Sequence, residues 1–224
     1  MTKTLPILFN TKMVRAVLEC RKTQTRRLLK TQPTDGNIKG IKPKYNVGDI
    51  LYVRETWKPG AWQWIQRVAI DYKASPELTN TPWIRLSDID FNKYLQRWAD
   101  ELEAKKIYSD VDGIYRWDAG SSKFNWRPSI HMPKWAARIF LKVVDIRIER
   151  IQDMTAQDFI AEGCGEFDDM AGSMKSPDGR YINHKKGFIN TWNSIYQKQD
   201  YGWDKNPWVF VYEFEKLEDN NNNG

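Results

Sequence analysis

The chain has 224 residues, of which 41% are hydrophobic and 29% charged, and its formal net charge is +6 at pH 7. This length fits one large domain or two small ones, and the composition is that of an ordinary globular protein. Two cysteines are too few for a disulfide framework, and no apolar run approaches the roughly 20 residues of a membrane-spanning helix. The first residues also lack the apolar segment of a signal peptide. We therefore expect a cytoplasmic protein with reduced thiols and no membrane association.

The basic residues are concentrated near the start of the chain. Residues 1–30 carry eight lysines and arginines against one acid, Glu19, so this segment is +7. Such a cluster attracts polyanions, with phosphate as the expected partner, and a solvated basic face without a ligand is the alternative. The two histidines and two cysteines lie at no ligand-like spacing. We therefore expect no metal site and no cofactor.

The predicted elements begin with a short apolar strand at 6–9, after which Asn10 is a candidate N-cap. Apolar residues at helical spacing over 13–18 predict a helix that ends near Cys20, and the polar residues from Thr23 to Arg27 favour an extended or turning path. Further strands are predicted at 50–57, after a turn at 47–49, and at 67–73, where apolar and charged residues alternate.

Residues from about 75 to 125 are predicted to form an insertion between strands. Phe91, Leu95, Trp98 and Leu102 recur at helical spacing within it, and Ser87 with Asp90 can form a capping box. The chain as a whole has 11 tryptophans, 10 tyrosines and 9 phenylalanines. Most of these rings are expected in the core, and a few exposed rings could stack on bases.

The segment 138–150 gives the longest strand signal, but its apolar residues change face near Val143 and Val144. A β-bulge or a sharp bend at this point would reconcile the two halves, as happens where a sheet curls into a barrel. The pattern then predicts a helix capped by Thr155 and Asp158 and ended by Gly163.

A second helix is predicted over 185–196, with Phe188, Trp192, Ile195 and Tyr196 buried, followed by a last strand at 208–214. Residues 219–224 are predicted to be a disordered tail. We find no internal repeat and no linker. The expected fold is α+β: one domain over 1–218, built as a small curled β-barrel with helices at its rim and a helical, Trp-rich insertion.

The segment from Glu19 to Arg27 contains the residues with the clearest chemistry. A lysine close to a threonine hydroxyl can act as a base when burial or neighbouring cations lower its pKa, so Lys22 could activate Thr25 as a nucleophile. An arginine or a backbone N–H would then stabilise the oxyanion. The alternative is a basic loop that binds phosphate without catalysis, and composition and spacing by themselves favour this alternative.

The spacing of Cys20, Lys22, Thr25 and Arg27 resembles the motif Gly-x-Lys-x-x-[Glu/Thr]-x-Arg of the ASCH superfamily, whose members are relatives of PUA domains. The segments 47–55 and 154–163 and the final strand are also similar to ASCH sequences. The phrase from Asn125 to Pro133 is similar to one found in phage and prophage members. The resemblance covers most of the chain outside the insertion, and it implies a small PUA-like β-barrel with a cleft beside the motif.

Some ASCH proteins are amidohydrolases that remove the acyl group of N4-acetylcytidine with a lysine, a threonine and a distant glutamate. Lys22 and Thr25 match the first two, and Glu162 is the candidate for the third by its position after the long strand. The resemblance implies that Lys22 activates Thr25, that Thr25 attacks the amide carbonyl, and that Glu162 shuttles a proton. Cys20 stands where the family usually has glycine, at a cost of about 1 kcal/mol if the position needs a positive φ.

Three functions follow as hypotheses. The first is a phage-associated ASCH-type protein that binds RNA, another nucleic acid or a modified nucleotide. The second is an amidohydrolase acting on N4-acetylcytidine-like nucleosides, and the third is an accessory protein whose insertion docks a protein partner. The residues expected to contact nucleic acid are Arg21, Arg26, Arg27, Arg54, Arg127 and His131.

Overall fold

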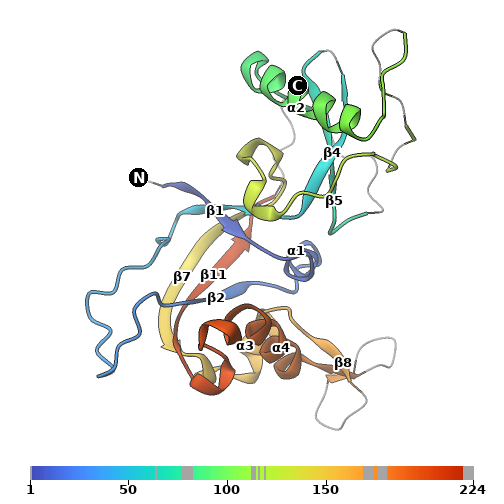
Figure 1. Cartoon of the computed structure of the whole chain (residues 1–224). Helices are drawn as coiled ribbons and strands as arrows, with labels where there is room; N and C mark the ends of the chain where they lie inside the picture. Colours follow the sequence, from blue (N-terminus) through green and yellow to red (C-terminus); the bar gives the residue numbers. More distant parts are fainter. Residues whose placement is uncertain are drawn as a thin grey trace. The chain divides into compact units, whose positions relative to one another are not determined.

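The computed structural model describes residues 2–63, 65–76, 83–111, 115, 117–118, 120–168, 174–175 and 181–218. Two compact units emerge from the contacts within the chain. The first unit comprises Met1–Leu5, Lys12–Tyr52 and Ile139–Gly224, and the second comprises Pro6–Thr11 and Val53–Arg138. The fold is mixed α+β, as the sequence predicts (Figure 1).

A five-stranded sheet forms the framework of the first unit, and two of its strands, β1 and β3, continue into the second. Its order is β1 (Thr4–Leu8), β3 (Ile50–Arg54), β7 (Phe140–Arg150), β11 (Trp208–Lys216) and β2 (Gln24–Leu28). β1 and β2 are the two edges of this sheet, so the described strands do not close into the barrel that the sequence analysis expects. The physical reason is that β2 pairs only with β11, which leaves its other edge without a strand partner among the described residues.

The predicted bulge in the long strand is confirmed. Glu213 of β11 pairs with Asp145 of β7, whereas the next residue, Phe214, pairs with Val143, so that Val144 is skipped. The extra residue explains the change of face in the sequence, because it brings Val143, Ile146 and Ile148 opposite alternate residues of β11, namely Phe214, Tyr212 and Phe210. A bulge also increases the local bend and twist of a strand, and β7 and β11 are strongly curved in Figure 1.

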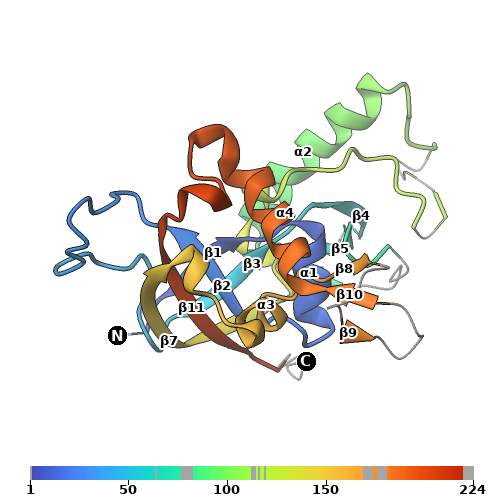
Figure 2. The same ribbon diagram turned by 90° about the horizontal axis from the view of Figure 1, so that it is seen from below.

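Three helices accompany this sheet: α1 (Thr11–Leu18), α3 (Ala156–Ala161) and α4 (His184–Tyr196). α3 and α4 pack on each other through Phe159, Phe188 and Trp192, together with apolar residues of β11 (Figure 2). The prediction that Ile195 is buried is wrong, since 38% of it is exposed.

The remaining elements of the first unit are short. A three-stranded antiparallel sheet, which the sequence did not predict, has the order β8 (Glu166–Asp168), β10 (Tyr181–Asn183) and β9 (Met174–Lys175). The 3-10 helices are η3 (Ile151–Asp153), η4 (Gln197–Gln199) and η5 (Trp203–Lys205). The predicted tail at 219–224 lies outside the described residues.

The second unit has its own sheet and core. β4 (Trp57–Gln63), β5 (Arg67–Tyr72) and β6 (Ile84–Arg85) are antiparallel neighbours, and α2 (Asp88–Ala104) begins after the predicted N-cap Ser87. The 3-10 helices η1 (Ser129–His131) and η2 (Lys134–Ala136) follow. The fully buried side chains of its core include Trp57, Trp98 and Leu102. Most aromatic residues of the predicted insertion therefore build a core of their own.

The predicted insertion of 75–125 lies inside this second unit, which also contains 53–74 and 126–138. The single domain over 1–218 stays a prediction. Across the part of the chain that the structure describes, every helix is too short or too polar to cross a membrane.

Candidate functional site

The loop between α1 and β2 begins with a helix cap at Cys20. Its φ is 56°, in the left-handed region, and its N–H donates to Val17 O at 3.1 Å. The next two N–H groups, of Arg21 and Lys22, both donate to Ala16 O, at 2.8 and 3.0 Å. These bonds satisfy carbonyls at the end of α1, which is the role glycine usually fills at this position. They also turn the chain so that Lys22 enters the interior.

Replacing Cys20 with glycine is expected to raise the free energy of unfolding by about 1 kcal/mol, because glycine adopts a positive φ without the steric cost of a Cβ. Cys20 is exposed, so little packing is lost. Chemical denaturation of the purified variant and wild type checks this result. Cys20→Ala, which keeps the Cβ, is the control and should change stability by less than about 0.5 kcal/mol. An equal gain from glycine and alanine would contradict the explanation.

Glu162 reaches the site from the end of α3. Thr155 caps this helix, since its hydroxyl accepts from Asp158 N at 3.2 Å, and the Asp158 carboxylate accepts from Thr155 N at 2.9 Å. The predicted capping box is therefore confirmed. Gly163 follows with a φ of +68°, and Thr23 N donates to Ala161 O at 2.9 Å. This contact places the end of α3 directly against the loop that carries Lys22.

Lys22 and Glu162 form a buried ion pair. Lys22 Nζ lies 2.7 Å from Glu162 Oε2 and also donates to Glu162 O at 3.0 Å and to Gln24 O at 2.8 Å. Exposure of the two side chains is 0% and 2%. The two residues stand 140 positions apart in the chain, so tertiary contact alone brings them together. A buried charge pair of this kind is stable only when further hydrogen bonds satisfy both groups, as they do here.

Arg26 joins the same network from β2. Its guanidinium contacts Glu162 Oε1 at 3.1 Å, Glu149 Oε1 at 2.7 Å and Asp158 Oδ1 at 3.0 Å. Burial by itself would lower the pKa of Arg26, but the Glu162 and Glu149 carboxylates outweigh it and raise the pKa. Arg147 is a further partner, with Nη2 2.7 Å from Asp158 Oδ1. Arg26 is thus held inside the protein rather than presented to phosphate.

The sequence analysis did not predict that Glu149 and Arg147 belong to this network, nor that the Asp158 carboxylate forms ion pairs in it. No local motif marks Glu149 and Arg147, which simply alternate along β7. Asp158 was recognised only as a capping residue, although Gln24 Nε2 also donates to it at 2.9 Å. Burial would raise the pKa of Asp158, yet the hydrogen bonds from Thr155 and Gln24 and the contact with Arg26 leave it well below its usual range.

Thr25 and Glu162 line one small cavity beside β2. Its volume is about 20 Å³, which is room for about one water. Thr25 is only 1% exposed, and its hydroxyl has no hydrogen-bond partner among the described residues. The other lining residues are Met13, Arg26, Arg27, Cys164, Phe188, Thr191, Trp192, Ile195 and Tyr196.

Comparison with models of known protein families, with curated proteins and with solved structures gave no match. Within the described ranges, no three histidines, cysteines or carboxylates gather in a way that could hold a metal ion.

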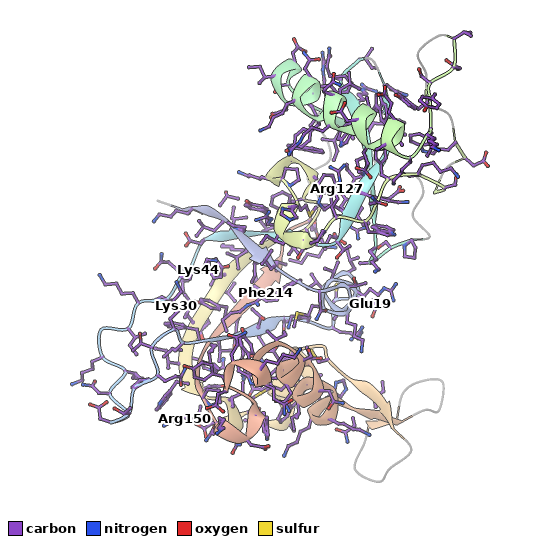
Figure 3. All side chains as sticks on the ribbon, in the orientation of Figure 1. Glu19, Lys30, Lys44, Arg127, Arg150 and Phe214 are labelled. Atoms are coloured by element: carbon purple, nitrogen blue, oxygen red, sulfur yellow. The ribbon has the colours of Figure 1, made fainter. Side chains whose placement is uncertain are left out.

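The remaining predicted phosphate contacts of the first unit differ in their surroundings. Arg21 is exposed, pairs with Glu19 (labelled in Figure 3) and donates from Nη1 to Gly163 O at 3.0 Å. Arg27 is half-buried and lines the cavity. Of the three predicted contacts in the basic segment, Arg21 thus lies in a surface ion pair, whereas Arg26 and Arg27 both line the cavity. The Arg26 side chain is held in the buried network.

The other three predicted nucleic-acid contacts belong to the second unit. Arg54 donates from Nη2 to Ile130 O. Arg127 (labelled in Figure 3) forms an ion pair of 2.7 Å with Glu101 and lies over the Trp57 ring. His131 is exposed in η1. Glu55, the sequence neighbour of Arg54, pairs with Arg138 at 2.9 Å instead.

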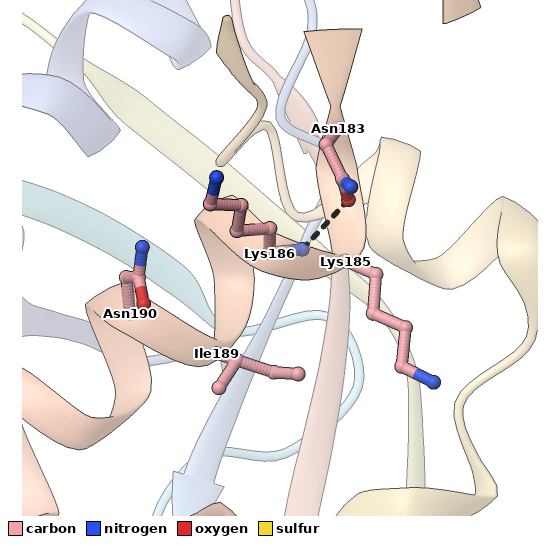
Figure 4. A pocket seen from close by; sticks show the side chains of 5 residues that line it. All are labelled: Asn183, Lys185, Lys186, Ile189 and Asn190. Atoms are coloured by element: carbon pink, nitrogen blue, oxygen red, sulfur yellow. Dashed lines mark hydrogen bonds between the residues drawn. The ribbon is translucent and has the colours of Figure 1, made fainter. Parts of the chain in front are cut away.

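Two further hollows lie away from this cavity. One, of about 260 Å³, surrounds the start of α4, where Asn183 Oδ1 accepts from Lys186 N at 2.9 Å (Figure 4). Its two lysines, Lys185 and Lys186, are exposed, so it offers charge without an enclosed site. The other, of about 400 Å³, lies in the second unit along α2 and is bordered by Trp62 and Tyr115.

Proposed function

We propose that the first unit is an amidohydrolase that removes the acyl group from N4-acylated cytidine or a closely related modified nucleoside. One observation carries this proposal: Glu162 forms a buried ion pair with Lys22 and lines one cavity with Thr25. These are the three residues that the resemblance to ASCH amidohydrolases implies as catalytic. The resemblance rests on short motifs, and the juxtaposition of these side chains is an independent argument for the same chemistry.

The hydrogen bonds favour Glu162, rather than Lys22, as the group that moves the proton. A lysine ammonium has three protons and no acceptor site, and Lys22 donates to three acceptors. Each oxygen of the Glu162 carboxylate has about two acceptor positions, so both oxygens keep capacity after bonding Lys22 and Arg26. In our proposal the two cations hold the carboxylate in place, and Glu162 accepts the hydroxyl proton of Thr25.

The reaction then follows acyl transfer through a covalent intermediate. Thr25 Oγ bonds to the acyl carbon, the bond from this carbon to N4 breaks, and N4 leaves as the amine with the proton that Glu162 had accepted. Water adds to the resulting threonine ester and gives a proton to Glu162. The ester then releases a carboxylic acid, and Thr25 recovers its proton. The sum is one amide and one water converted to one acid and one amine.

Cys164 is the other candidate nucleophile at the cavity, and its environment argues against it. Burial raises the pKa of its thiol, with a smaller opposing effect from Lys22. The thiolate is the reactive form of cysteine, so this thiol is less reactive at neutral pH than an ordinary one. Thr25, which lines the same cavity as the Glu162 carboxylate, is therefore the nucleophile we assign.

The test is the release of acetate and cytidine from N4-acetylcytidine by the purified chain. We expect turnover by the wild type and a loss of at least about 1,000-fold in kcat/KM for Thr25→Val, which keeps the shape of the side chain and removes the nucleophile. Thr23→Val is the matched control, because Thr23 is exposed two residues earlier, and it should retain activity. A wild type that releases no acetate at any accessible enzyme concentration refutes the amidohydrolase.

Binding to a nucleic acid polymer is the other function that the sequence analysis favours, and the basic segment 1–30 remains its support. The burial of Arg26 among three carboxylates argues against polymer binding, because this guanidinium cannot reach a phosphate without leaving its partners. Inactivity on N4-acetylcytidine, combined with RNA affinity that falls steeply with salt, would support polymer binding instead.

A further inference from the structure

The main chain of Arg26 has hydrogen-bonding groups that the sheet does not use. In an antiparallel pair, residues alternate between those whose N–H and C=O bond the neighbouring strand and those whose groups point away. Leu29 N donates to Trp208 O at 3.1 Å and Phe214 N to Thr23 O at 2.9 Å, and both pairs continue the register of β2 with β11. The odd-numbered residues of β2 therefore bond β11, and the N–H and C=O of Arg26 point to the free edge.

Gln24, the residue before Arg26 that faces this edge, confirms that the main-chain groups of these residues point away from β11. Gln24 has the same parity, and its carbonyl accepts from Lys22 Nζ, which comes from outside the sheet, at 2.8 Å. No corresponding partner occurs for the Arg26 N–H or C=O among the described residues. Arg26 is 4% exposed. Buried main-chain groups are almost always paired with protein, water or ligand, so this donor and acceptor need an explanation.

Three consecutive residues of β2 line the cavity, and successive side chains of a strand point to opposite faces, so we infer that the cavity borders the edge of β2. Arg26 lines it together with Thr25 and Glu162, and residues of α4, including Phe188 and Trp192, line it as well. The N–H and C=O of one extended residue point in the same direction, as an adjacent donor and acceptor. The ring edge of cytosine offers the complement, an acceptor at N3 beside the donor N4–H, and enzymes that act on bases commonly read this edge through hydrogen bonds.

We propose that the main-chain N–H and C=O of Arg26 bind N3 and N4–H of the cytosine ring and so position the acyl group at Thr25. This inference rests on the proposed function and names the group that gives it base selectivity. It assigns two roles to one residue, since the Arg26 side chain holds Glu162 while its main chain contacts the substrate. Arg26 is a positioning residue through its side chain and a binding residue through its peptide groups.

Addition of a peptide strand to this edge is the other use of unpaired main-chain groups, and the surroundings disfavour it. Strand addition needs several alternating residues with free groups. On β2 the Gln24 carbonyl is already bonded to Lys22, and aromatic residues of α4 border the cavity. Arg26 and Leu28 remain, a stretch too short to hold an added strand, and of these two only Arg26 lines the cavity.

Amide hydrogen exchange, measured residue by residue with NMR on the full chain, tests the proposal. In the free protein the Arg26 amide should exchange at least tenfold faster than that of Arg27, which bonds β11. Saturating cytidine should slow the Arg26 amide at least tenfold and change the Arg27 amide by less than threefold. N4,N4-dimethylcytidine, which lacks the N4–H donor, should bind at least tenfold more weakly than cytidine.

The outcomes separate this inference from the proposed function. Selective protection of Arg26 by cytidine, without acetate release from N4-acetylcytidine, upholds the main-chain contact and removes the amidohydrolase. Acetate release with an Arg26 amide that cytidine leaves unchanged overturns the inference alone. Equal affinity for cytidine and its dimethyl derivative overturns the role of the Arg26 carbonyl, and a chain that binds neither nucleoside overturns the whole inference.

Discussion

Replacement of Lys22 with methionine is expected to lower the free energy of unfolding by about 3–5 kcal/mol, because it leaves the Glu162 carboxylate buried without its closest cation. The aliphatic part of the side chain is nearly conserved, so the loss reports the charge rather than the packing. Glu162 is 2% exposed and lies 2.7 Å from Lys22 Nζ. Arg26 remains 3.1 Å from its other oxygen, which favours the lower end of the range. Urea unfolding followed by circular dichroism measures the change.

Two further variants make this measurement specific. Lys30→Met removes an exposed lysine just after β2 and should change stability by less than about 0.5 kcal/mol. The double variant Lys22→Met with Glu162→Gln removes both charges and should recover at least about 1 kcal/mol of the loss, since no unpaired charge then remains buried. If Lys22→Met lowered the free energy of unfolding no more than Lys30→Met does, the buried ion pair would not be what holds α3 to the loop.

Gly163→Ala is the second substitution with a large expected effect, and it should lower the free energy of unfolding by about 2–4 kcal/mol. A Cβ at Gly163 would lie 2.8 Å from the Cβ of Ala16 and 3.0 Å from the Cβ of Lys22, closer than carbon atoms normally approach. The strained positive φ contributes about 1 kcal/mol of the total, and the forced separation of the two segments contributes about 1–3 kcal/mol. The same separation should move Glu162 away from Lys22 and abolish any activity that needs both.

Gly48→Ala separates the two contributions, because Gly48 also has a positive φ, +89°, but nothing lies within 4 Å of its added Cβ. It should cost about 1 kcal/mol from backbone strain alone. The free energies of unfolding of the two variants are measured under the same denaturation conditions. The difference between them is the free-energy cost of the close approach at Gly163. Equal costs would mean that α3 tolerates a shift away from the loop.

Local sequence patterns predicted the local elements well. The Thr155–Asp158 capping box, the bulge at Val144 and the helix after Ser87 are each set by a few neighbouring residues, and the structure has all three. The resemblance to ASCH sequences raised the question whether Cys20 needs a positive φ, and its φ in the structure is 56°. The prediction of burial was less reliable, because burial depends on which other elements cover a side chain. Ile195 was predicted to be buried and is exposed.

The buried network shows why charge counts in sequence misled the analysis. The first 30 residues carry a net charge of +7, which suggested a surface for phosphate. The structure brings Glu149, Asp158 and Glu162 to Lys22 and Arg26, so that part of this charge is neutralised inside the protein. Tertiary contact across more than 100 positions creates this pairing, and no local spacing encodes it.

The small size of the cavity beside Thr25 has a consequence for affinity. A space of about 20 Å³ is smaller than a nucleoside, so a ligand of that size binds only to a form in which residues that line the cavity have moved apart. The measured dissociation constant is then the intrinsic one divided by the fraction of molecules in that open form. With about 1% open, binding is about 100-fold weaker than the contacts alone would give. Weak affinity for free nucleosides would therefore report the rarity of the open form as much as the quality of the contacts.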